Sequence, residues 1–154
     1  NGLDCLTQPV DCGSIMGMGG RTIAEILRAG QARLHGATLV LSAHTDLELV
    51  RQAVQDIGYH LTQERLCRAG NRWYVFLQAV PGSAHYSALE MIVGPCLPHS
   101  GDPLLPGYAA WRRHVWADKL AGLRTAREPD TQEIARVEAI LEAYAHMMKE
   151  EASC

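Results

Sequence analysis

Several features that would assign this 154-residue sequence to a specialised class of protein are missing from it. It has no run of about 18 apolar residues, the length that crosses a bilayer, so it predicts no membrane-spanning helix. Its five cysteines are an odd number and show no Cys-x-x-Cys spacing. This argues against a disulfide framework and a zinc site, and we expect free thiols and no bound metal. No signal peptide is recognisable, so we expect a cytoplasmic protein.

Positive charge is also scarce. The chain has 14 Lys and Arg residues against 17 Asp and Glu, a formal net charge of −3. An acidic total argues against nucleic-acid binding, since phosphate contacts need clustered basic residues. Residues 108–127 nevertheless hold one acid and five basic residues: Arg112, Arg113, Lys119, Arg124 and Arg127. Trp111 and Trp116 lie among them, and this mixture suits a track for an RNA backbone. Alternatively, the tryptophans pack a helix pair and the arginines form a solvated face.

The first half of the chain repeats a pattern of strand, loop and helix. The apolar run 13–17 predicts a buried strand, Gly17-Met18-Gly19-Gly20 a turn, and the apolar spacing that follows a helix up to Gly30. The second unit has a strand at 37–41, a loop at 42–46 and another helix. Two such units in succession predict parallel strands in a layered α/β domain.

The second half follows a different plan. Residues 60–66 and 73–80 suggest two strands joined by a turn at residues 68–72, which predicts an antiparallel hairpin. A proline-containing stretch that ends at about residue 107 is expected to be irregular. Two helices, at about 108–123 and 130–149, are then expected to form an antiparallel pair.

The glycine-rich turn is the first candidate for a functional site. Gly17, Met18, Gly19 and Gly20 follow a predicted parallel strand, and α/β folds bind ligands at the carboxyl ends of such strands. Because glycine lacks a β-carbon, this turn lets the backbone come close to a ligand. A plain tight turn between strand and helix is the alternative.

Three further residues each allow two interpretations. His44, in the loop after the second strand, suits contact with a base or an RNA backbone, or is a solvated histidine. Asp46 is expected to cap the next helix rather than to act as a catalytic acid. Tyr74, in the hairpin, either orients a ligand or packs in the core of the sheet.

Four segments, in this order, carry a resemblance to a known family. They are Asn1-Gly2-Leu3; Ile15 to Gly20 with Ile23, Ile26 and Leu27 behind it; Leu49, Arg51, Gly58, Tyr59 and Glu64; and Trp73 to Phe76 followed by Gly94-Pro95. The set resembles the bacterial tRNA adenine-N1 methyltransferases of the TrmK type, class I enzymes that depend on S-adenosylmethionine (SAM). The second segment, similar to that family's Ile-Ala-Gly-Met-Gly-Gly motif, is the most specific.

The resemblance implies a fold and an activity. The implied fold class is α/β: the C-terminal part of a Rossmann-like class I methyltransferase sheet, with parallel strands ending in an antiparallel hairpin, plus a C-terminal antiparallel helix pair. We place the partial methyltransferase domain at residues 1–95 and the coiled-coil-like helical appendage at residues 96–154. The implied activity is methyl transfer from SAM to N1 of an adenine in tRNA.

The same resemblance implies roles for particular residues. Catalysis, by alignment of the reacting groups, is expected at Gly17, Met18, Gly19 and Gly20. Cofactor binding is expected at Asn1, Gly2, Met16 and Gly17. From their position and charge, and not from the resemblance itself, contact with tRNA is expected at His44, Arg112, Arg113 and Lys119.

The sequence departs from the family in several places. Leu41-Ser42-Ala43-His44 stands where the family has Leu-Gln-Pro-Asn, and Met16 replaces a small alanine. The strand and glycine loop with which such enzymes hold the methionine part of SAM are absent. We therefore expect a fragment of a longer protein that is inactive by itself and binds SAM very weakly. The strand Gly13–Gly17 would then be an open edge, and we expect self-association through it.

Two other functions compete with methyl transfer. A non-catalytic module that binds RNA or a protein would use the helix pair and its basic face, with a purely structural glycine turn. A nucleotide-binding enzyme of other chemistry would use Gly17–Gly20 for phosphate. The sequence has neither a Gly-x-Gly-x-x-Gly pattern nor a P-loop lysine, which argues against this second function.

Overall fold

A computed structural model describes residues 2–149 of the chain, which divides into two compact units. The first is Asn1–Ser100 and the second is Gly101–Cys154. The division follows Ser100, a few residues beyond the boundary placed after Pro95 from the sequence. Each unit contains its own buried apolar side chains.

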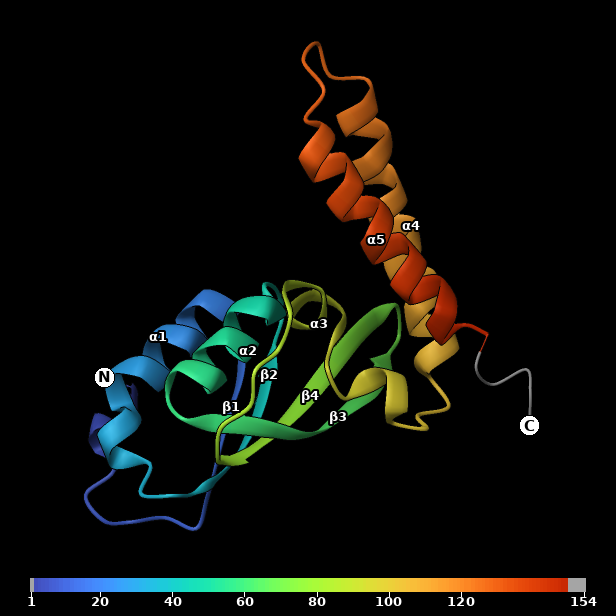
Figure 1. The fold of residues 1–154 in the computed structure, drawn as a ribbon. Helices are drawn as coiled ribbons and strands as arrows, with labels where there is room; N and C mark the ends of the chain where they lie inside the picture. The colour runs from blue at the N-terminus through green and yellow to red at the C-terminus, as the bar shows by residue number, and fades with distance from the viewer. Residues whose placement is uncertain (1, 150–154) are drawn as a thin grey trace. The chain divides into compact units, whose positions relative to one another are not determined.

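A four-stranded sheet forms the centre of the first unit (Figure 1). Its strands are β1 Cys12–Met18, β2 Thr38–Ala43, β3 Tyr59–Ala69 and β4 Arg72–Pro81, in the spatial order β1-β2-β4-β3. β1 and β2 are parallel, as the two strand–loop–helix patterns predict. β4 is antiparallel to both β2 and β3. The predicted α/β class, with parallel strands followed by a hairpin, is therefore confirmed.

Helices cover one face of this sheet (Figure 1). They are α1 Gly20–Gly30, α2 Leu47–Asp56 and α3 Ala88–Val93, and short 3-10 turns lie at η1 Gly2–Cys5, η2 Gln31–Arg33 and η3 Leu97–His99. Alternate strand residues on the covered face are buried: Ile15, Leu39, Leu41, Val75, Leu77 and Ala79. This alternation follows from the two-residue period of a strand, which sends successive side chains to opposite faces.

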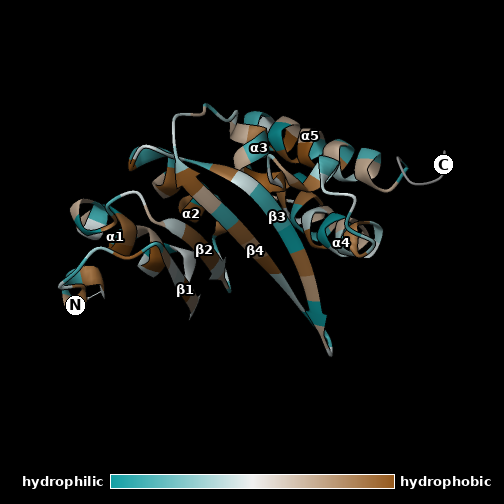
Figure 2. Cartoon of the chain, turned by 90° about the horizontal axis from the view of Figure 1, so that it is seen from below, coloured by the Kyte–Doolittle hydropathy of each residue, from teal (hydrophilic) through white to brown (hydrophobic). Residues whose placement is uncertain are grey.

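The opposite face of the sheet is partly exposed. Figure 2 shows the strands from this side, with hydrophobic and hydrophilic residues alternating along β3 and β4. On β4 this face carries Tyr74, Phe76, Gln78 and Val80, which are all of intermediate exposure. Met16, near the end of β1, is 42% exposed. One face of the sheet therefore forms the core, and the other is available for contacts.

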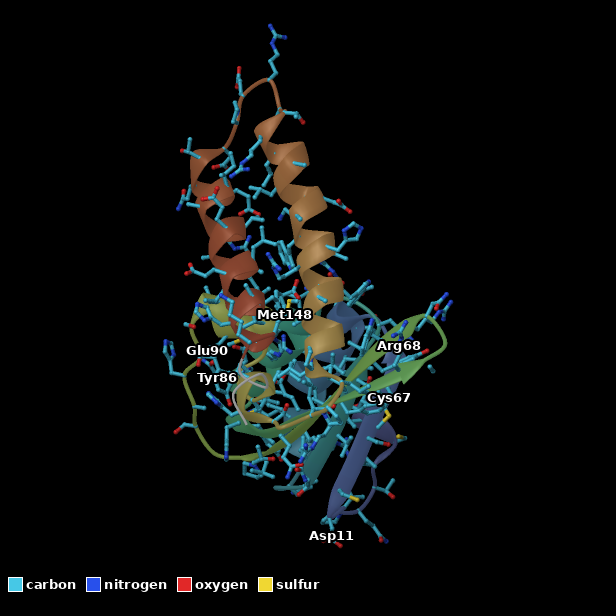
Figure 3. All side chains as sticks on the ribbon, turned by 90° about the vertical axis from the view of Figure 1, so that its right-hand side faces the viewer. Asp11, Cys67, Arg68, Tyr86, Glu90 and Met148 are labelled. Carbon is cyan, nitrogen blue, oxygen red and sulfur yellow. The ribbon has the colours of Figure 1, made fainter. Side chains whose placement is uncertain are left out.

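The stretch expected to be irregular contains a helix that the sequence analysis missed. α3 begins with a capping box, in which Ser87 Oγ accepts a hydrogen bond from the Glu90 backbone (3.2 Å) and Glu90 Oε2 accepts one from the Ser87 backbone (2.7 Å). Figure 3 labels Glu90 and Tyr86 where the chain enters this helix. The Ser-x-x-Glu spacing was a readable helix start, but the surrounding prolines and glycines obscured it.

The hairpin is longer than expected, because its strands extend to Ala69 and Arg72. The predicted turn at residues 68–72 was therefore too wide. Only Gly70, with a φ of +58°, and Asn71 lie between the strands. A cross-strand contact of the Arg68 guanidinium with the Trp73 ring, at 5.1 Å from the ring centroid, accompanies the last pairs.

The second unit is a pair of helices, α4 Leu105–Arg124 and α5 Thr131–Met147. Their buried residues face one another and include Tyr108, Leu120, Val137, Ile140 and Tyr144. Ion pairs link the two helices at Lys119–Glu133 and Arg124–Glu138, both at 2.6 Å. Asp130 caps α5 by accepting hydrogen bonds from the backbone of Gln132 and Glu133. The predicted helix pair is thus confirmed.

Two structural features are absent from residues 2–149. None of the helices described there combines the length and the apolar character that crossing a membrane requires. The same residues contain no group of three or more His, Cys, Asp or Glu side chains that could hold a metal ion.

Candidate active site at the carboxyl edge of the sheet

The glycine-rich turn forms an open bend where β1 ends. Gly17 is exposed and has a φ of +79°, a left-handed conformation that glycine adopts without strain. A β-carbon built on Gly17 would meet no described atom within 4 Å apart from those of Gly17 itself and its two chain neighbours. The pairing of β1 with β2 shifts register between Met16 and Met18, so the strand bulges at this point. The backbone at Gly17 is therefore accessible rather than buried under side chains.

The bend is held against the loop that follows β2. The Gly20 backbone N–H donates to the Thr45 carbonyl (2.9 Å), and the His44 N–H donates to the Met18 carbonyl (3.0 Å). A β-carbon on Gly20 would overlap the Asp46 carbonyl oxygen. Gly20 is thus required for close backbone packing, whereas Gly17 opens outward. The structure brings Gly17, Met18, Gly19, Gly20 and His44 together at one edge.

Asp46 does not cap α2 as expected. It occupies the N-cap position but has a left-handed conformation, with a φ of +53°, and its carboxylate caps no backbone N–H. Instead, its Oδ2 accepts a hydrogen bond from the Thr45 hydroxyl at 2.9 Å. The left-handed backbone directs the Asp46 side chain away from the helix, which sequence reasoning alone did not anticipate.

Two aromatic rings meet beside the bend. The His44 and Tyr74 ring centroids are 6.1 Å apart and the rings are inclined at 66°, an edge-to-face arrangement. His44 is exposed and Tyr74 partly exposed. These rings add a flat, partly apolar wall to the edge formed by the glycine backbone.

A cavity of about 440 Å³ lies along β1. Gly2 and Met16, two of the residues expected to bind cofactor, both line it. Most of its other lining residues are apolar and include Leu3, Leu6, Val10, Ile15, Ile26 and Leu39. Of the other two residues expected to bind cofactor, Gly17 lies in the bend described above, and Asn1 lies outside the described residues. The volume falls in the range of small-molecule sites.

The basic residues expected to contact tRNA lie on α4, in the second unit. Arg112 Nε donates to the Tyr144 hydroxyl (3.3 Å), and the Arg112 guanidinium lies 5.8 Å from the centroid of the Trp116 ring. Lys119 pairs with Glu133. Arg113 is exposed and lies 3.9 Å from the Met148 sulfur. Arg112 and Lys119 therefore also help to hold the helix pair together.

Arg51 and Glu64, for which the sequence predicted no functional role, form a buried ion pair. Arg51 Nε donates to Glu64 Oε1 at 2.9 Å, and both side chains are 0% exposed. The Arg51 guanidinium also donates to the carbonyls of Met91 (2.8 Å) and Ile92 (3.1 Å). Glu64 Oε2 accepts from the backbone N–H groups of Cys96 (2.8 Å) and Leu97 (3.0 Å). The pair thus connects α2 and β3 to the chain around α3 and η3.

Gly94 is the third part of this arrangement. Its φ is +103°, and a β-carbon there would lie 2.6 Å from Glu64 Oε2 and 3.0 Å from the Arg51 guanidinium. The sequence did contain a sign of this buried pair. Arg51 on α2 and Glu64 on β3 are charged residues at positions where the apolar pattern of the element predicts a buried side chain. Burial, followed by repulsion from the Glu64 carboxylate, raises the pKa of the neighbouring Cys96 thiol to about 11.

Comparison with known proteins finds a family and several solved structures. The family model described as tRNA (adenine(22)-N(1))-methyltransferase, TrmK, matches residues 1–145. The crystal structure of Streptococcus pneumoniae Sp1610 is similar to this chain with a TM-score of 0.76 and 24% identity, over 90% of this chain and 62% of that one. The Bacillus subtilis M1A22 tRNA methyltransferase TrmK gives a TM-score of 0.75 and 22% identity, over 90% and 63%.

The S. pneumoniae protein is also similar in its complex with S-adenosyl-L-methionine, with a TM-score of 0.67, 24% identity and coverage of 90% of this chain and 60% of that one. These structures share the fold of this chain. A search of curated proteins finds no match. The chain spans slightly less than two thirds of the length of these solved relatives.

Proposed function

Because the chain belongs to the tRNA (adenine(22)-N(1))-methyltransferase family, we propose that it forms the adenine-receiving part of an enzyme that methylates N1 of an adenine in tRNA, with SAM as methyl donor. The observation that carries this proposal is the open bend at Gly17, held beside His44 at the carboxyl edge of two parallel strands. The activity is proposed for the family's full length, of which the chain spans about 62% in the S. pneumoniae relative. A tRNA substrate would place the protein in the cytoplasm.

Methyl transfer from SAM to adenine requires mainly that the two reacting groups be aligned. N1 of adenine is a weak nucleophile, and bound SAM supplies a methyl group that its sulfonium already activates. A protein accelerates such a reaction by holding the two reacting atoms in line and in contact. Gly17, Met18, Gly19 and Gly20 suit this task, because the bend presents backbone without a β-carbon at Gly17 and its position is fixed by the hydrogen bonds to residues 44 and 45.

The cofactor would lie on the β1 side of the bend. Gly2, Met16 and Gly17 would contribute to holding it, together with Asn1. The fit rests on the open space at Gly17 and on the cavity of about 440 Å³ that Gly2 and Met16 share. The apolar lining suits the uncharged parts of such a ligand, and the described residues form one wall of its site.

For tRNA, we propose contacts from His44 at the bend and from Arg112, Arg113 and Lys119 on α4. Arg113 is exposed and, among residues 2–149, forms no ion pair, so its charge is available to a phosphate. Lys119 would have to share its charge between Glu133 and the RNA. We therefore expect Arg113 to contribute most of the electrostatic affinity of this helix.

A chimera tests the proposed activity. The N-terminal portion of the S. pneumoniae relative is joined to this chain, and unmodified tRNA is assayed for 1-methyladenosine by mass spectrometry. We expect methyl transfer, and we expect Gly17→Val to lower its rate about a hundredfold, since a side chain in the bend displaces the reacting groups. Glu48→Gln, a change on the exposed side of α2, serves as the matched control. A chimera that folds and binds SAM but makes no 1-methyladenosine would contradict the proposal.

Gel shifts with the chain itself separate an RNA-binding role from a protein-binding one. We expect tRNA to be retained at low salt and released when Arg113 is replaced by Glu. Arg136→Glu, on the exposed part of α5, is the matched control for the charge change. Absence of tRNA binding at any salt concentration would favour the alternative of a module that binds another protein.

A further inference from the structure

We propose that Tyr74 contacts the target adenine directly, and that the Tyr74 and His44 rings form an aromatic corner that orients this base beside the glycine bend. The proposal rests on the proposed function, since it takes an adenine of RNA as the ligand. It assigns a role to Tyr74, which the sequence left between a ligand contact and a core position.

The strand register places this corner at the reactive edge. Leu41 of β2 pairs with Leu77 of β4 in antiparallel order, so His44 and Tyr74, three residues further along in opposite directions, come opposite one another. On its other side, the His44 backbone donates to the Met18 carbonyl at 3.0 Å. Met18, whose register partner is Ala43, is thus hydrogen-bonded to His44, and His44 lies opposite Tyr74, so the three residues lie next to one another at the carboxyl edge.

The exposure and geometry of the corner suit a flat heterocycle. The two rings are inclined at 66° with centroids 6.1 Å apart, so a base stacked on one ring would direct its edge toward the other. Within residues 2–149 no hydrogen bond is made by the Tyr74 hydroxyl or by the His44 ring nitrogens. These groups remain available for the exocyclic amine and ring nitrogens of adenine.

Neighbouring side chains extend the same surface. Met16 is paired with Ser42 in the preceding row of the sheet and is 42% exposed, which adds a polarisable apolar group beside the corner. Phe76 lies two residues beyond Tyr74 on the same face of β4 and is also partly exposed. The surface is therefore apolar behind the corner and open in front of it, at Gly17.

Fluorescence of a modified RNA tests this inference. The probe is an RNA stem–loop that carries 2-aminopurine in place of one unpaired adenine and fluorescein at its end. Stacking quenches 2-aminopurine, while anisotropy of the fluorescein reports binding anywhere on the protein. The variants are Tyr74→Ala, Tyr74→Phe and His44→Ala. Trp73→Ala, which removes an aromatic ring from the opposite face of the same strand, is the matched control.

We expect the unmodified chain to quench 2-aminopurine, and Tyr74→Phe to preserve the quenching because the stacking face remains. Tyr74→Ala should abolish it and weaken binding about tenfold, the usual effect of losing one stacked base. Trp73→Ala should leave the quenching unchanged. His44→Ala alters an exposed loop residue without threatening the fold, so it should reduce the quenching even if Tyr74→Ala destabilises the sheet.

Two results would overturn the inference. If anisotropy shows binding while Tyr74→Ala and His44→Ala quench like the unmodified chain, Tyr74 does not contact the base, although the proposed function stands. If the probe does not bind the unmodified chain at all, both the RNA-binding role and this inference are contradicted.

Discussion

At the residue scale, the glycines of the bend serve different physical purposes. Gly20 is buried, and its missing β-carbon makes room for the backbone oxygens of Thr45 and Asp46. Gly17 is exposed and has open space around it, but its φ is +79°. A side chain would therefore meet a steric obstacle at Gly20 and only a conformational one at Gly17.

Alanine substitutions separate these two effects. We expect Gly20→Ala to lower the free energy of unfolding by about 3 kcal/mol, since the loop after β2 must move to admit a methyl group. Gly17→Ala should cost only about 1 kcal/mol, the penalty of a left-handed conformation for a residue with a β-carbon. Urea unfolding followed by circular dichroism measures both. Equal losses would show that the contact between the bend and residues 45–46 is not tight.

The cysteines give a second prediction at this scale. The pKa of Cys96 is raised to about 11 by burial and by the Glu64 carboxylate. At pH 8 roughly one Cys96 side chain in a thousand is then a thiolate, the form that reacts with alkylating agents. Cys67, labelled on the hairpin in Figure 3, is exposed. Timed treatment with iodoacetamide and mass spectrometry should show Cys67 modified well before Cys96; the reverse order would contradict the raised pKa.

At the scale of elements, the buried Arg51–Glu64 pair joins parts of the first unit that are distant in sequence. Arg51 belongs to α2 and Glu64 to β3, and their remaining hydrogen bonds go to backbone groups at residues 91–97. Every polar atom of the Glu64 carboxylate is thus satisfied without water. Such a pair specifies one arrangement of its neighbours, because removing either partner leaves a buried charge without compensation.

Replacing one partner should be costly. We expect Glu64→Gln to lower the free energy of unfolding by about 3 kcal/mol, because Arg51 then remains charged and buried. The control is Asp56→Asn, which breaks the exposed pair with Arg28 and should cost less than about 1 kcal/mol. The double variant Arg51→Met/Glu64→Leu should regain part of the loss. If Glu64→Gln and Asp56→Asn lower the free energy of unfolding by the same amount, the buried pair does not hold these elements together as we describe.

The helix pair gives a pH prediction. A hydrogen bond from Lys119, and to a smaller extent one from Arg136, lowers the pKa of Glu133 below its ordinary value of 4.5. A lowered pKa contributes stability that is fully present above about pH 4.5 and is lost as the pH falls through the lowered value. At pH 7 we therefore expect Glu133→Gln to lower the melting temperature by about 2 °C, a modest effect because the pair is exposed.

The difference between Glu133→Gln and the unmodified chain should shrink as the pH falls through the lowered pKa of Glu133, because the glutamate is then protonated. Glu142→Gln is the matched control, since Glu142 lies 3.9 Å from His146 and both are largely exposed. A difference that persists undiminished down to the lowest pH at which the chain stays folded would show that the ion pairs of Glu133 are not its cause.

At the scale of the whole molecule, the sheet has two edges of different character. β3, at one edge, is long, and its exposed residues include Thr62, Gln63 and Arg65. β1, at the other edge, carries no charged residue and lies beside the apolar cavity that Met16 lines. Uncharged edges favour pairing with further strands, and charged ones discourage it.

We therefore predict self-association through Gly13–Gly17 of β1. Sedimentation velocity of the chain should show a species larger than the monomer, and Ser14→Lys should shift it toward the monomer by placing a charge on the edge. Thr62→Lys, at the opposite edge, is the matched control and should leave the distribution unchanged. A monomer at all concentrations, or equal effects of both lysines, would contradict the role of β1.

Local patterns determined much of this protein. Apolar residues at a period of two and at helical spacing predicted the parallel strands, the hairpin and the helix pair, because these periods reflect which side chains one element buries. The ordered segments around Gly17–Gly20 predicted the family, which the match over residues 1–145 confirms. The Ser87–Glu90 capping signal was present in the sequence too, but prolines on both sides suggested loop.

Only the tertiary structure decided which residues meet. The contact of Tyr74 with His44, the overlap that excludes a side chain at Gly20, and the Arg51–Glu64 pair under Gly94 all join positions from different elements. No local period encodes such pairs, since they depend on strand register and on how closely two backbones approach. Asp46 shows the same limit, because its left-handed backbone, and not its residue type, turned the expected cap away from α2.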